Sequence, residues 1–76
     1  MNLNQFLNEH FEDYIYLYKA STGEHITDVA VKFIPLWILK TYGDMNISVE
    51  LDLTVAPEKK KYSVFNVWVK DNVQND

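Results

Sequence analysis

A strict alternation of apolar and polar residues runs through residues 45–55. A β-strand directs successive side chains to opposite faces, so this alternation predicts one apolar and one polar face. No helical stripe fits the same residues. We therefore predict that this segment is the central strand of a small antiparallel sheet. Its apolar side would carry Met45, Ile47, Val49, Leu51, Leu53 and Val55, opposite Asn46, Ser48, Glu50, Asp52 and Thr54.

Three other segments are predicted to be strands. Residues 13–19 and 24–34 alternate in character, and Gly23 between them can adopt the positive φ of a hairpin bulge. Residues 62–70 are rich in the aromatic and β-branched residues that favour strands. A polar loop at residues 56–61 would connect this last strand to the one before it.

Two short helices complete the prediction. The first would begin at an N-cap, Asn2 or Asn4, and end near Phe11, with apolar side chains at helical spacing along one side. The second would begin at Pro35 and end before Gly43, because proline suits the first turn of a helix and glycine the position after the last. The alternative for this second segment is a buried strand with a bulge at Pro35.

These elements give a single α+β domain over residues 1–70, followed by a polar tail at residues 71–76. Their order is α-β-β-α-β-β, with a four-stranded antiparallel sheet made of two hairpins and a helix before each. A chain of 76 residues without cysteine has a thin stability margin and neither disulfides nor thiolate metal sites to support it. We therefore expect self-association as a homodimer.

The register of the last strand decides which residues the sheet exposes. Phe65, Val67 and Val69 form an uninterrupted apolar set that suits the apolar side of residues 45–55. The opposite face would then carry aromatic and acidic residues together: Tyr62, Val64, Trp68, Glu50 and Asp52, joined by Tyr14, Tyr16 and Tyr18. Such a face should not be bare to water. A helix of the same chain, a second copy in a homodimer or a different partner could cover it.

The charged residues exclude some classes of function. Seven lysines and no arginine stand against eleven acids, which gives a net charge of −4. Arginine supplies the bidentate contacts to phosphate and guanine, so a duplex nucleic-acid binder is disfavoured. No export signal is visible, and the longest apolar-leaning run, residues 33–39, is far shorter than the ~20 residues of a membrane span. We expect a cytoplasmic protein without membrane contact.

His10 and His25 are the candidates for general-base catalysis. Each has carboxylates nearby in the sequence, but eleven acids in 76 residues make that expected by chance. A metal site needs at least three converging ligands, and no nucleophile or oxyanion motif accompanies the histidines. Residues 21–24 lack the glycines and lysine of a phosphate loop. We therefore expect no enzymatic activity, no metal and no cofactor.

Protein binding is the function that these features favour. A small acidic protein can occupy the nucleic-acid-binding channel of a partner, with carboxylates in place of phosphates and aromatic anchors beside them. Anti-defence proteins of phages and plasmids share this size, charge and composition, although no motif carries the likeness. We predict an accessory or inhibitory protein of a phage or other mobile element. Its partner-binding residues would be Trp68, Tyr62, Glu50 and Asp52, with Tyr14, Tyr16 and Tyr18 second.

Weak binding of single-stranded nucleic acid is the alternative. Lys59, Lys60 and Lys61 form the one basic run of the sequence, and exposed tyrosines beside it could stack on bases. The same lysines are also explained as a solvated loop that prevents edge-to-edge pairing of the strands. Nucleic-acid binding should weaken steeply with salt, whereas an acidic mimic should lose its partner when Glu50 and Asp52 become lysine.

Overall fold

The computed structural model describes residues 1–54 and 62–71. The predicted α+β class is confirmed, and the helices and strands follow one another in the predicted order. The predicted loop at residues 56–61 and residues 72–76 of the tail lie outside the described residues. The elements are α1 (Leu3–Glu9), β1 (Tyr14–Lys19), β2 (His25–Ala30), a 3-10 turn η1 (Val31–Phe33), α2 (Leu36–Tyr42), β3 (Ile47–Leu51) and β4 (Val64–Val69).

The described strands form one mixed sheet in the order β2-β1-β4-β3. β1 pairs antiparallel with β2, and β3 pairs antiparallel with β4. The two pairs meet through a parallel ladder between β1 and β4. The prediction of a wholly antiparallel sheet is therefore wrong, and β3, predicted as the central strand, lies at an edge.

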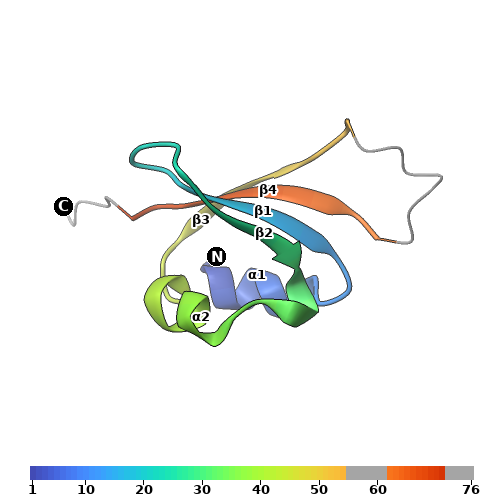
Figure 1. Ribbon diagram of the computed structural model, residues 1–76, viewed down its shortest axis with the longest axis horizontal. Coiled ribbons are helices and arrows are strands. Elements are labelled where there is room, and N and C mark those ends of the chain that lie inside the picture. Colours follow the sequence, from blue (N-terminus) through green and yellow to red (C-terminus); the bar gives the residue numbers. More distant parts are fainter. Residues whose placement is uncertain (55–61, 72–76) are drawn as a thin grey trace.

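The composition of the strands explains this order. The inner strands β1 and β4 supply the fully buried side chains Ile15, Leu17, Val67 and Val69. β3 alternates apolar residues with exposed Ser48 and Glu50, which water can solvate at an edge. The chain leaves β2, passes through η1 and α2 beneath the sheet, and enters β3 at the opposite edge (Figure 1).

α1 and α2 lie on the same side of the sheet (Figure 1). Of the two predicted caps, Asn2 is the N-cap of α1: its side-chain Oδ1 accepts from the Gln5 amide at 2.9 Å, and its own amide donates to Gln5 Oε1 at 2.8 Å. The buried core joins apolar residues of both helices to one face of β1 and β4: Leu3, Phe6, Leu7, Ile38, Tyr42, Ile15, Leu17, Val67 and Val69. Burying each large aliphatic side chain contributes about 1.5–3 kcal/mol.

The second strand is shorter than predicted. It ends at Ala30, and the following residues form η1 instead of continuing the strand to residue 34. The turn directs Val31 into the core and leaves Phe33 73% exposed. α2 then begins after Pro35 and ends before Gly43, which confirms the predicted helix and excludes the buried-strand alternative.

The predicted register of the last two strands is confirmed. Val67 and Val69 of β4 lie opposite Val49 and Ile47 of β3, so the aliphatic sets share a face. Only the first part of β3 joins the core, however, because Ile47 packs against it while Val49 and Leu51 are exposed. The apolar side of β3 is therefore only partly buried, since the core stops short of its second half.

Candidate functional site

The face of the sheet opposite α1 and α2 carries a group of aromatic side chains. β1 and β4 run parallel and in register there, with Tyr18 beside Trp68. Tyr62 lies just before β4 and stacks on Tyr14. We call this surface the aromatic face and define it by Tyr14, Tyr16, Tyr18, Tyr62 and Trp68. The sequence prediction that these residues share one face is confirmed.

Contacts between the rings hold the aromatic face in one arrangement. The rings of Tyr18 and Trp68 stack with centroids 5.6 Å apart and an interplanar angle of 23°. Tyr14 and Tyr62 stack at 6.2 Å and 27°, and Tyr16 is tilted against Tyr14 at 5.8 Å. Each aromatic pair adds about 0.5–1.5 kcal/mol beyond its buried area. A partner would therefore meet rings that are already ordered, which lowers the entropic cost of binding.

No described helix covers the aromatic face, because α1 and α2 both pack on the other side (Figure 1). Of the three possible covers named from the sequence, a helix of the same chain is therefore excluded among the described residues (Figure 1). The aliphatic face offers a better match to the apolar sides of α1 and α2, since a tyrosine hydroxyl beneath a helix would need a buried hydrogen-bond partner. That a second copy in a homodimer or another partner covers the aromatic face stays a prediction.

Carboxylates lie at both edges of the aromatic face. On the β2 edge, Asp28 lies opposite Tyr16 and accepts a hydrogen bond from the Tyr14 hydroxyl at 3.0 Å. This hydrogen bond favours the neutral phenol and raises the pKa of Tyr14. His25 Nε2 lies 3.2 Å from the second oxygen of Asp28.

Glu50 and Asp52 lie at the other edge, where Glu50 is opposite Asn66 of β4. Asp52 accepts hydrogen bonds from the Thr54 hydroxyl at 2.6 Å and from the Thr54 amide at 2.9 Å. These bonds stabilise the charged carboxylate and hold the pKa of Asp52 below its usual value. No lysine among the described residues forms an ion pair with either acid. The predicted aromatic and acidic residues are therefore brought together on one surface.

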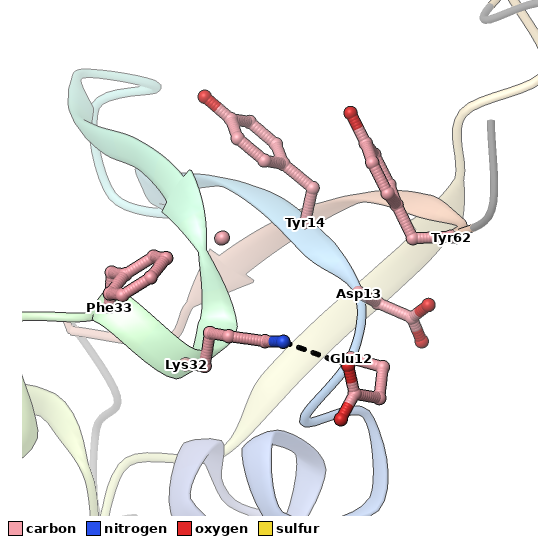
Figure 2. A pocket seen from close by; sticks show the side chains of 7 residues that line it. Glu12, Asp13, Tyr14, Lys32, Phe33 and Tyr62 are labelled. Atoms are coloured by element: carbon pink, nitrogen blue, oxygen red, sulfur yellow. Dashed lines mark ion pairs between the residues drawn. The ribbon is translucent and has the colours of Figure 1, made fainter.

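A pocket of about 540 Å³ opens at one end of the aromatic face (Figure 2). Figure 2 shows the rings of Tyr14 and Tyr62 side by side, with Phe33 across the pocket. Lys32 Nζ forms an ion pair of 3.0 Å with Glu12 Oε1 at its rim. The lining residues are Glu12, Asp13, Tyr14, Ala30, Lys32, Phe33 and Tyr62.

The charged groups of the pocket already have partners in the protein. Asp13 accepts a hydrogen bond from the Ser63 amide at 2.9 Å, and its other oxygen lies 3.0 Å from Nδ1 of His10. Glu12 is paired with Lys32. The walls that remain for a ligand are aromatic, so the pocket suits an apolar side chain of a partner better than a reacting group.

The two histidines lie apart, His10 after α1 and His25 at the start of β2. Each contacts one carboxylate, Asp13 and Asp28 respectively. Within residues 1–54 and 62–71, no three potential metal ligands are grouped together. The same described part of the chain contains no helix long and apolar enough to span a bilayer.

Three residues of the site are not among those predicted from the sequence. Lys32 and Phe33 fall in the segment predicted as a strand, and Pro35, two residues after Phe33, is the signal that favours an earlier end of that strand. Asp28 could have been found from the hairpin around Gly23, which has a positive φ of 76° as predicted, because antiparallel pairing places Asp28 opposite Tyr16.

The predicted nucleic-acid-binding residues Lys59, Lys60 and Lys61 lie outside the described residues. Comparison of the chain with protein-family models, curated protein sequences and solved structures finds no match.

Proposed function

We propose that the protein is a non-enzymatic binding module whose aromatic face docks a basic segment of another protein. The observation that carries this proposal is a group of ordered aromatic rings that no described helix covers, between carboxylates at both edges of the sheet. Lysine and arginine side chains stack on tyrosine and tryptophan, with a gain of about 0.5–1 kcal/mol at exposed sites and ~2 kcal/mol when desolvated. The flanking carboxylates would pair with the same cations.

The negative charge of the chain supports an inhibitory role. Many basic surfaces of proteins bind nucleic acid, and a chain with a net charge of −4 is attracted to them over long distances. Glu50 and Asp52 would then occupy phosphate positions while Trp68 and the tyrosines anchor the complex. We propose an accessory or inhibitory protein of this kind from a phage or other mobile element.

Single-stranded nucleic acid is the second candidate ligand. Aromatic rings on an open sheet face are a surface on which bases stack. Asp28, Glu50 and Asp52 on the same face would repel the phosphates, so a basic protein segment is the better fit.

Matched charge reversals test the proposal. The probes are a fluorescent Arg-Gly repeat peptide and a single-stranded oligo-dT, each titrated against wild type, Glu50→Lys/Asp52→Lys and Glu9→Lys/Asp44→Lys. Both double variants change the net charge from −4 to 0, because each acid-to-lysine change adds two units. Glu9 and Asp44 are exposed residues outside the four strands.

We expect the first double variant to bind the peptide about tenfold or more weakly, and the second to lose much less. Equal losses in both variants would show non-specific charge attraction and contradict a site on this face. Tighter binding of oligo-dT than of the peptide by wild type would favour the second candidate.

A further inference from the structure

The outer edge of β3 presents unpaired backbone groups. Lys70 N donates to Asn46 O at 2.9 Å, and Asp52 N donates to Val64 O at 2.8 Å. Backbone groups alternate in direction along an antiparallel strand, so the odd-numbered residues between these bonds point away from β4. Val49 and Leu51 therefore direct their N–H and C=O groups outward, and no described residue pairs with them.

The same edge already accepts backbone pairing at its start. Ile47 N donates to Met1 O at 3.2 Å, and Asn2 and Asn46 form an antiparallel bridge. These contacts confirm the outward direction of the odd-numbered residues. They also show that an extended segment fits beside this edge, up to Ile47.

The side chains beyond Ile47 make this edge attractive to a partner. Val49, Leu51 and Leu53 are 39%, 47% and 84% exposed on the side of the sheet that α1 and α2 occupy. Sheet edges are commonly protected by lysine, proline or a bulge. Residues 47–53 contain neither lysine nor proline, and the β3–β4 register runs without a shift. As far as the described residues show, the edge beyond Ile47 is open to strand addition.

Charge decides which strand can occupy it. An antiparallel second copy with its Leu51 opposite Val49 would place Glu50 opposite Glu50. In the next possible register, with Leu51 opposite Leu51, Glu50 would lie opposite Asp52. Like charges directly opposite each other destabilise a strand pair. A shift of the second copy in the other direction would pair Leu51 with Ile47, but the outward N–H of Ile47 already donates to Met1 O. A second copy is therefore a poor occupant.

We infer that the β3 edge docks an extended, antiparallel segment of a protein partner in which apolar and cationic residues alternate. Its apolar residues would lie beside Val49 and Leu51, and its lysines or arginines beside Glu50 and Asp52. The partner's backbone would complete the outward hydrogen bonds, as in other cases of strand addition. This inference rests on the proposed function only in taking the partner to be basic.

Synthetic peptides test the inference directly. The probe is an acetylated, amidated Val-Lys repeat, and the matched control is a Val-Glu repeat of the same length. Two further probes carry N-methyl groups on the valines or on the lysines. In the proposed register the valine N–H groups face β3 and the lysine N–H groups face away. Only methylation of the valines should abolish binding.

Amide hydrogen exchange by NMR gives the readout. We expect the Val-Lys peptide to slow exchange of the Val49 and Leu51 amides by about tenfold or more, and the Val-Glu peptide to leave it unchanged. Leu51→Lys should abolish this protection, whereas Leu36→Lys on exposed α2 should not. Protection that survives methylation of the valines, or no protection at all, overturns the inference. So does protection at high protein concentration without peptide, because a second copy would then be the occupant.

The two proposals can fail separately. Tyr16→Ala changes the aromatic face but leaves the outward edge of β3 intact. If Tyr16→Ala abolishes binding of the Val-Lys peptide and Leu51→Lys does not, the basic segment binds the aromatic face, and docking at the edge is overturned. Loss in Leu51→Lys alone would support the edge. Titration of Trp68→Ala with the Arg-Gly peptide would then decide the aromatic face independently, because Trp68 lies on an inner strand and not at the β3 edge.

Discussion

Two substitutions on opposite faces of the sheet separate folding from recognition. Leu17→Ala changes a side chain of β1 that is fully buried beneath α1 and α2. Trp68→Ala removes a partly buried ring of β4 that stacks on Tyr18 on the aromatic face. If the aromatic face is a binding site, the first change should mainly lower stability and the second should mainly lower affinity.

The magnitudes follow from burial. Leucine-to-alanine changes in cores cost about 2–5 kcal/mol, and buried tryptophan-to-alanine changes about 3–5 kcal/mol. Trp68 is only partly buried, so we expect Trp68→Ala to cost less than the loss of a fully buried tryptophan, roughly 1.5–2.5 kcal/mol including the stacking on Tyr18. A chain of 76 residues has a free energy of unfolding of about 4–11 kcal/mol. Trp68→Ala should therefore leave a folded protein, whereas Leu17→Ala removes a large part of the total.

Urea unfolding followed by far-UV circular dichroism measures the stability difference, and titration with the Arg-Gly peptide measures affinity. We expect a loss of about tenfold or more in affinity for Trp68→Ala, as for an interface hot spot. Leu17→Ala should bind normally once the folded fraction is taken into account. A loss of 3 kcal/mol or more in Trp68→Ala (roughly the full cost of a buried ring) with unchanged affinity would show that the tryptophan is structural and refute the proposed site.

Three further predictions concern single groups. Gly43→Ala should lower the free energy of unfolding by about 1–3 kcal/mol in urea titrations, because the added Cβ would collide with backbone and side-chain atoms. In ultraviolet titrations of tyrosinate, Tyr14 should ionise above its usual pKa of 10.0, and Asp28→Asn should lower the pKa of Tyr14. The hydrogen bond from Tyr14 to Asp28 contributes its full share to the free energy of unfolding below pH 10. This contribution is lost as the pH rises through the raised pKa of Tyr14. Asp71 accepts hydrogen bonds from the Ser21 amide and hydroxyl, which lower the pKa of Asp71 from 3.8. Wild type should therefore exceed Asp71→Asn in thermal stability at neutral pH, and the difference should vanish as the pH falls below 3.8.

Local signals were enough to predict most of the elements and the faces of the strands. The cap of α1 at Asn2 and the end of α2 before Gly43 depend on single residues and their neighbours. The faces of β3 and β4 follow from alternation once the most apolar sets are paired. The position of the predicted partner-binding residues on one surface follows from the same alternation, because Tyr18 and Trp68 are in register across the inner strands.

The order of strands could not be derived in the same way. Alternation shows that one face of a strand is polar, which is true of many edge strands and says nothing about neighbours. The better signal for an inner strand is apolar character on both faces. β4 has it, with Val64 and Trp68 on one face and Val67 and Val69 on the other. The long alternation of residues 45–55 was therefore the weaker candidate for the centre.

The open surfaces follow from the size of the helices. α1 and α2 have seven residues each and are therefore about 10 Å long and about 10 Å wide. Strands of five to six residues in a four-stranded sheet span about 17–20 Å by about 14 Å. Two such helices cover most of one face and none of the other. The aromatic face and the second half of β3 lie beyond their reach, and these are the two surfaces that we propose meet a partner.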